Sequence, residues 1–309
     1  MRLDRLDRRG LGTLERAVRG GEPVILGRGV HADRPLDELV PLVHEVEDPE
    51  HRRWLAPGAR PGTGYRVSVI IPTHRTAPIG LLALTAQDVM VDVHILANGA
   101  YPGDAPGGAA VERVPWEGHG TTRQRAVERV ASPYVLFTVD DALPLGAGFV
   151  RTLVEALEEG RYDAVYARQV PWPLADAVTR ARLRAWTPPG DRHTSSVQLD
   201  HVAALHRRDL LLEDPLPDVP TAEDWVWSRR HRVGYVPTAP VVHAHPRHFA
   251  ALYRRTRDIH AVRTAWGEAS TVPDLRTLVG ALLGTVGWDL PGALGELLGQ
   301  YAGGRRRRG

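Results

Sequence analysis

Two adjacent carboxylates, Asp140 and Asp141, end an apolar run in the stretch YVLFTVDDALP. Residues 134–139 have the length and the β-branched and aromatic side chains of a buried strand. Aspartate is common where a strand enters a turn, because its short side chain accepts hydrogen bonds from the local backbone. The same pair at the carboxyl edge of a parallel sheet could hold a divalent cation, since α/β enzymes bind ligands at that edge. Both alternatives fit this stretch when it is taken alone.

A second acidic cluster lies in TAEDWVWSRR, residues 221–230. Thr221 is followed three residues later by Asp224, a capping-box pattern that predicts the start of a helix. Glu223 and Asp224 would also suit the positive end of the helix dipole. A carboxylate held rigidly at a helix start could equally serve as a general base.

Histidine and arginine complete the set of residues that could do chemistry. His243 and His245 follow an apolar run in VVHAHP, and residues two apart lie on one face of a strand. Arg75, after the strand predicted at 67–71, could reach a diphosphate or a base, although an ordinary loop is the alternative. Arg123, predicted in the first turn of a helix in GHGTTRQRAV, could bind an anion or form a surface ion pair.

The segments that must position these residues alternate between strand-like and helix-like patterns from Tyr65 onward. Regular alternation predicts an α/β fold with a mostly parallel sheet and helices on both faces. Strands are predicted at 67–71, 91–97, 134–139 and 162–170, an edge strand at 109–114, and helices at 79–88, from Thr121 or Thr122, and at 146–160.

Three regions are expected along the chain. Residues 1–64 form an N-terminal extension of unknown role, 65–260 the main domain, and 261–309 a helical C-terminal region. The last region ends in four arginines, Arg305–Arg308, which could contact anionic lipid headgroups or act as a disordered solubilising tail.

Composition excludes several classes of function. The chain of 309 residues has no cysteine, which excludes disulfides, zinc–thiolate sites and thiol nucleophiles. Its 39 basic and 37 acidic residues leave a net charge of +2, which argues against a nucleic-acid partner. The longest uncharged apolar run near the C-terminus, 277–288, has 12 residues, whereas a bilayer needs about 20. A cytoplasmic protein is expected, with peripheral contact at the inner face of the membrane through the arginine tail as an extension.

Six segments in order, VSVIIPTHR, ILANGA, GHGTTRQRAV, VLFTVDDALP, AEDWVWSRR and VVHAHP, resemble the inverting family-2 glycosyltransferases of GT-A fold. The rhamnosyltransferase-like branch is the most similar, and the resemblance covers about residues 65–260. It implies a GT-A-type twisted sheet and transfer of a sugar from a nucleotide-diphosphate donor to an acceptor hydroxyl, with Mg²⁺ or Mn²⁺. The acceptor could be a polysaccharide, a small metabolite or a peptide.

The same resemblance implies a role for each matching residue. Asp224 is expected to be the catalytic base. Asp141, Asp140 and His243 are expected to hold the metal, with Asp140 nearer the donor ribose and His245 behind His243. The residues expected to bind the donor are Pro72, Thr73, Arg75, Asn98, Arg123, Asp140, Glu223 and Trp225.

Two positions depart from the family pattern. Ala97 stands where an aspartate usually holds the nucleobase, and its side chain cannot accept a hydrogen bond. Gln124 replaces the usual asparagine. Ala97 also supports an alternative, a catalytically silent module that binds nucleotide sugars. A nucleotidyltransferase is a further alternative, but the basic glycine-rich signature that it requires does not follow Ile71.

Overall fold

The computed structural model describes residues 2–3, 24–26, 43–46, 64–74, 78–85, 87–99, 105, 108–172, 175, 177–243, 249–267 and 290–304. These residues belong to two compact units. Unit 1 comprises Met1–Glu117, Thr122–Pro215 and His231–Ala244, and unit 2 comprises Gly118–Thr121, Leu216–Arg230 and His245–Gly309. The boundary predicted at residue 260 falls inside a helix of unit 2.

Unit 1 is built on a nine-stranded sheet with the order β10-β12-β9-β11-β7-β4-β5-β6, in which β8 also pairs with β12. Six strands run in one direction, and β8, β10 and β11 run opposite, which confirms the predicted mostly parallel sheet. The strands are β4 (Arg66–Thr73), β5 (Met90–Ala97), β6 (Ala110–Arg113), β7 (Tyr134–Thr138), β8 (Leu143–Pro144), β9 (Ala164–Val170), β10 (Thr194–Ser196), β11 (Ala203–Arg207) and β12 (Val233–Val242).

The parallel strands bring their carboxyl ends to one edge of this sheet. β4 pairs in parallel with β7, with Val67 opposite Tyr134, and β9 pairs in parallel with β12. β11 lies between β7 and β9 and is antiparallel to both. The segments that follow β4, β7, β9 and β12 therefore leave the sheet at the same edge.

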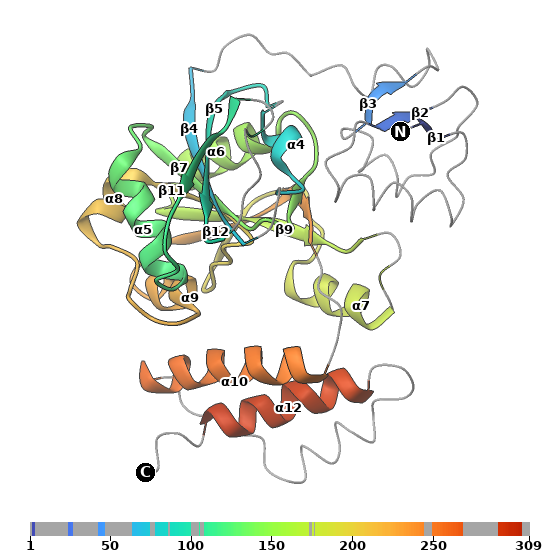
Figure 1. The fold of residues 1–309 in the computed structure, drawn as a ribbon, viewed down its shortest axis with the longest axis vertical. Helices are drawn as coiled ribbons and strands as arrows, with labels where there is room; N and C mark the ends of the chain where they lie inside the picture. Colours follow the sequence, from blue (N-terminus) through green and yellow to red (C-terminus); the bar gives the residue numbers. More distant parts are fainter. Residues whose placement is uncertain are drawn as a thin grey trace. The chain divides into compact units, whose positions relative to one another are not determined.

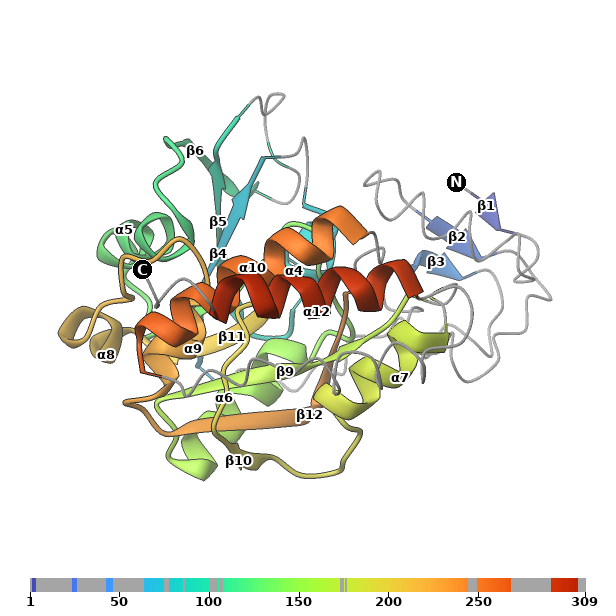
Figure 2. The same ribbon diagram turned by 90° about the horizontal axis from the view of Figure 1, so that it is seen from below.

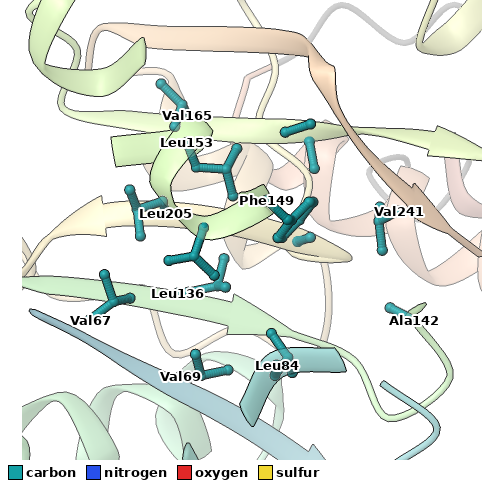
Figure 3. Close-up of a cluster of buried hydrophobic side chains, with 14 of the residues drawn as sticks. Val67, Val69, Leu84, Leu136, Ala142, Phe149, Leu153, Val165, Leu205 and Val241 are labelled. Atoms are coloured by element: carbon teal, nitrogen blue, oxygen red, sulfur yellow. The ribbon is translucent and has the colours of Figure 1, made fainter. Parts of the chain in front are cut away.

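The helices of unit 1 pack on both faces of the sheet, as the alternating pattern predicts. They are α4 (Leu81–Thr85), α5 (His119–Arg129, of which the first residues belong to unit 2), α6 (Phe149–Gly160), α7 (Ala177–Trp186) and α8 (Arg208–Glu213). Figure 3 shows Phe149 and Leu153 of α6 in the apolar core with Leu136 of β7. The next residue of β7, Phe137, points to the opposite face, where Arg123 of α5 lies over its ring.

Two predicted helices differ in their bounds. The helix predicted at 79–88 is limited to α4 (Leu81–Thr85). α5 begins at His119, earlier than the predicted Thr121 or Thr122. The early start is explained by packing, because Gly120 lies so close to the Pro217 carbonyl that a Cβ there would collide with it.

Unit 2 contains α9 (Glu223–Ser228), α10 (Phe249–Ala265) and α12 (Leu290–Gly304). α10 and α12 lie side by side in both views (Figures 1 and 2). Three glycines spaced four apart on α12, Gly295, Gly299 and Gly303, face the backbone of α10. α9 packs on α10 through Trp225 and Val226 against Val262.

Two further observations concern the ends of the chain and the membrane. The short strands β1 (Arg2–Leu3), β2 (Val24–Leu26) and β3 (Val43–Val46) form a separate parallel sheet. None of the helices in the described parts of the chain is both long enough and apolar enough to cross a bilayer. Arg75, His245 and the tail Arg305–Arg308 lie outside the described residues.

Candidate functional site

The turn after β7 is fixed to the end of β4. Thr73, the last residue of β4, donates its hydroxyl to Asp140 Oδ2 at 2.8 Å, and both side chains are buried. The backbone carbonyl of Asp140 accepts the amide of Ile79 at 2.9 Å. His74 Nδ1 lies 3.9 Å from the same carboxylate oxygen of Asp140. The parallel pairing of β4 and β7 thus brings together Thr73 and Asp140, which were both predicted to bind the donor.

Asp141 faces His243. The distance from Asp141 Oδ1 to His243 Nε2 is 3.5 Å, and only 10% and 5% of the two side chains are exposed. Sheet register explains this meeting of residues that are 102 positions apart. β8 pairs antiparallel with the end of β12, with Leu143 opposite Val242. Asp141, just before β8, and His243, just after β12, are therefore brought to the same point.

His243 is held by a chain of hydrogen bonds to a second carboxylate. His243 Nδ1 lies 3.0 Å from Gln169 Oε1, and Gln169 Nε2 donates to Asp200 Oδ2 at 2.5 Å. A carboxylate only accepts hydrogen bonds, so the amide nitrogen of Gln169 must face Asp200 and its oxygen must face His243. His243 Nδ1 therefore carries a proton, and Nε2 is the nitrogen that faces Asp141.

Asp200 is itself positioned by several donors. Its Oδ1 accepts the backbone amide of Val202 at 3.0 Å, and its Oδ2 also accepts Trp186 Nε1 at 3.4 Å. Metal-binding histidines commonly donate their second N–H to a carbonyl or carboxylate, which fixes the ring and its tautomer. The Gln169–Asp200 pair gives His243 this arrangement.

The donor set of Asp141 and His243 fits a divalent cation. It offers a carboxylate oxygen and an imidazole nitrogen, both buried, at a separation that one ion could bridge. Carboxylates suit Mg²⁺ and Mn²⁺, and imidazole suits the transition metals, so this mixed pair fits Mn²⁺ well. In the parts of the chain that the structure describes, no group of three or more His, Asp and Glu side chains surrounds one point. Among the described residues, Asp141 and His243 are therefore the two side chains that could contact one ion here.

The neighbouring residues of β4 and β5 have mainly structural contacts. Pro72 pairs with Leu96 in the β4–β5 register, and Thr73 pairs with Ala97. The amide of Asn98 donates to the Thr73 carbonyl at 2.8 Å. Its side-chain nitrogen contacts the carbonyls of Val114 and Pro115 at 3.2 and 3.3 Å and holds the loop after β6.

Arg123 lies in a different environment from the predicted one. Because α5 begins at His119, Arg123 is in the second turn of the helix and not in the first. Its side chain is buried, and the guanidinium lies 6.0 Å from the centre of the Phe137 ring. The same ring contacts His206, whose pKa burial holds well below its usual value. The expected position of Arg123 in a first helical turn is therefore wrong.

The acidic cluster of unit 2 also departs from the local pattern. The N-cap of α9 is Ala222, in a left-handed conformation with φ 59°, so Thr221 does not form the predicted capping box. Packing accounts for the difference, because Ala222 belongs to the small apolar cluster between α9 and α10. Asp224 Oδ1 accepts the backbone amide of Trp225 at 2.7 Å. Asp224 belongs to unit 2, whereas Asp141 and His243 belong to unit 1.

The aromatic residues of α9 are buried. Trp227 is fully buried and is a core residue. Trp225 is 8% exposed, and its ring lies 5.3 Å from the guanidinium of Arg229 and 4.9 Å from that of Arg263. Glu223, next to it, is also buried.

Gln169 and Asp200 were not identified from the sequence. A weak signal existed for Gln169, a polar residue that follows Arg168 inside the otherwise apolar strand AVYARQV. Asp200 lies in a loop between β10 and β11 and carries no sequence pattern of its own.

Comparison with solved structures shows that the chain has the GT-A fold of glycosyltransferases, which confirms the predicted fold class. Mannosyltransferase PcManGT from Pyrobaculum calidifontis, in complex with GDP-Man and Mn²⁺, is 19% identical and has a TM-score of 0.51, over 92% of this chain and 84% of that one. TarS from S. aureus in complex with UDP-GlcNAc is 14% identical with a TM-score of 0.47, over 76% and 72% of the two chains. No family model matches the chain. No curated protein matches it in sequence.

Proposed function

We propose that the protein is a metal-dependent inverting glycosyltransferase, a family-2-like hexosyltransferase that moves a sugar from a nucleotide-diphosphate donor to an acceptor hydroxyl. The observation that carries the proposal is the buried pair of Asp141 and His243, backed by Gln169, at the carboxyl edge of a GT-A sheet. The similar mannosyltransferase, which was solved with GDP-Man and Mn²⁺, supports the same class of donor.

Asp141 and His243 would hold Mn²⁺ or Mg²⁺. When bound, the cation would neutralise charge on the diphosphate leaving group and help to orient it. Asp140, fixed by the Thr73 hydroxyl, would face the donor ribose. The donor would also be contacted by Pro72, Arg75, Asn98, Arg123, Glu223 and Trp225.

Asp224 would act as the general base. It would accept the proton of the acceptor hydroxyl while the acceptor oxygen bonds to the anomeric carbon, on the side opposite the diphosphate. The bond from that carbon to the diphosphate oxygen breaks in the same step, so the configuration inverts. The left-handed Ala222 beside Asp224 supports this role, since strained backbone at a residue with a Cβ clusters at functional sites.

The test is donor binding and turnover with and without metal. Titration of the protein with GDP-mannose and UDP-N-acetylglucosamine should show binding in Mn²⁺ that is lost in excess EDTA. Asp141→Ala should abolish the metal-dependent part of the affinity, whereas Asp92→Ala, at an exposed position of β5, should leave it unchanged.

Release of nucleoside diphosphate, with or without an added acceptor, separates an enzyme from a silent binding module. Equal donor affinity in EDTA and in Mn²⁺ would contradict the metal assignment. Metal-dependent binding without any release of diphosphate would favour the silent module.

A further inference from the structure

Trp186, the last residue of α7, is an exposed aromatic side chain on a rigid support. About half of it, 48%, is exposed. Its indole N–H lies 3.4 Å from Asp200 Oδ2. Apart from this N–H, the surface of the ring is apolar.

The chain immediately after Trp186 is anchored on two strands. Thr187 is buried and donates its hydroxyl to the Gln169 carbonyl of β9 at 3.0 Å. The carbonyl of Pro188 accepts the Tyr235 hydroxyl of β12 at 2.6 Å. An exposed tryptophan with fixed backbone neighbours loses little conformational freedom when a ligand covers it, which favours binding.

The same hydrogen bonds connect Trp186 to the candidate metal ligands. Asp200 accepts both Trp186 Nε1 and Gln169 Nε2, and Gln169 holds His243. Trp186 is thus three hydrogen bonds from the imidazole that faces Asp141, and all of these residues belong to unit 1.

Trp186 is connected to that pair through His243, whereas Thr73 and Asp140 are connected to it through Asp141, the neighbour of Asp140 in the chain. Thr73 is the last residue of β4 and Asp140 follows β7, whereas α7 follows β9, and β11 separates β7 from β9 in the sheet. In Figures 1 and 2, α7 extends beyond the end of β9. The ribose end of the proposed donor site is therefore at β4 and β7, and the segment that follows β9 is available to the acceptor.

We infer that Trp186 is the stacking platform for a sugar ring of the acceptor, which makes the acceptor a carbohydrate. The inference rests on the proposed glycosyltransferase function and names the acceptor class of the same site. The C–H face of a pyranose packs on the electron-rich indole face, while its hydroxyl groups remain hydrated or hydrogen-bonded. One aromatic face matches one ring, whereas a lipid or an apolar peptide would call for a larger apolar patch.

The experiment measures binding of simple sugars by saturation-transfer NMR. The probes are the methyl glycosides of glucose, mannose, galactose, rhamnose and N-acetylglucosamine, added to the full chain with Mn²⁺ and either GDP or UDP. The variants are Trp186→Ala and Trp186→Phe. Trp116→Ala is the matched control, because Trp116 is equally exposed, at 54%, in the same unit.

At least one glycoside should bind the wild-type protein and Trp116→Ala equally, and bind Trp186→Ala about tenfold more weakly. Trp186→Phe should retain most of the affinity, because it keeps a stacking face and loses only the N–H to Asp200. Nucleotide-sugar affinity in Mn²⁺ should be unchanged in Trp116→Ala. Any change in it should be the same in Trp186→Phe and Trp186→Ala, because both lose the indole N–H to Asp200.

Equal glycoside binding by wild type and Trp186→Ala would overturn the inference, and so would the absence of any glycoside binding by a wild-type protein that binds nucleotide sugars. Loss of glycoside affinity in Trp186→Phe as large as in Trp186→Ala would also overturn it, because the N–H would then be what matters. A wild-type protein that binds no nucleotide sugar would reject the proposed function, and this inference with it.

Discussion

Asp200 decides, through Gln169, whether Nδ1 of His243 carries a proton. Both carboxylate oxygens of Asp200 accept hydrogen bonds, Oδ1 from Val202 and Oδ2 from Gln169 and Trp186. An asparagine has only one accepting oxygen, so Asp200→Asn must turn its NH₂ group toward one of these donors. If the NH₂ group of the new asparagine faces Gln169, the side-chain amide of Gln169 must turn over. The NH₂ group of Gln169 then faces His243 Nδ1, and the ring proton of His243 moves to Nε2.

We therefore expect Asp200→Asn to weaken Mn²⁺ binding by about 10- to 100-fold, the usual effect of losing an outer-shell partner. Free Mn²⁺ can be followed by EPR, and nitrogen-15 NMR of His243 reports the protonated nitrogen directly. Asp92→Asn is the surface control. Unchanged Mn²⁺ affinity together with a proton still on Nδ1 would show that Asp200 does not control the tautomer.

Asp224 has a local contact that its amide analogue can keep. Its Oδ1 accepts the Trp225 amide at 2.7 Å, and asparagine can present an oxygen to the same N–H. If Asp224 is the general base, Asp224→Asn should lower sugar transfer by about 10²- to 10⁴-fold and leave nucleotide-sugar affinity nearly unchanged. Asp218→Asn, an exposed substitution in the same unit, should transfer at the wild-type rate.

The two measurements to compare are kcat and the donor Kd. Normal turnover by Asp224→Asn, even with a slightly lowered melting temperature, would reduce Asp224 to a structural residue at the start of α9.

At the scale of elements, strands and helices are predicted correctly from the sequence where the burial of apolar side chains determines them. The apolar runs that became β4 and β7 were predicted because their side chains are buried on both faces of the sheet. The apolar face of α6, which includes Phe149, Leu153 and Leu157, was predicted correctly for the same reason. These patterns depend only on neighbours in the chain.

The errors occur where a distant contact overrides a local pattern. α5 starts early because Gly120 packs against the Pro217 carbonyl, and α9 has Ala222 as its N-cap because that residue packs with α10. Neither contact can be read from the local residues. The site shows the same division, since Asp141 and His243 could be nominated from motifs, whereas the contact of Gln169 with His243 depends on the register of β9 and β12.

At the scale of the whole molecule, the chain builds unit 2 from segments far apart in sequence. α12 packs on α10, and α10 supports α9, which carries Asp224. A Cβ on Gly299 of α12 would lie 2.5 Å from the Tyr253 carbonyl oxygen and 2.9 Å from the Arg257 amide nitrogen, both backbone atoms of α10. A change at residue 299 should therefore reach the proposed base through two helix contacts.

Gly299→Ala tests this coupling, and two effects of opposite sign decide the outcome. Alanine favours an isolated helix over glycine by about 1 kcal/mol, but overpacking against backbone costs about 1–3 kcal/mol. Because the colliding atoms are backbone and cannot rotate away, we expect net destabilisation, with a lower melting temperature by calorimetry and reduced sugar transfer.

Leu298→Ala, at a partly exposed neighbouring position, should change the melting temperature and sugar transfer much less. Mn²⁺ affinity should remain unchanged, since Asp141 and His243 belong to unit 1. A Gly299→Ala protein more stable than wild type would mean that residue 299 of α12 is not in close contact with the backbone of α10.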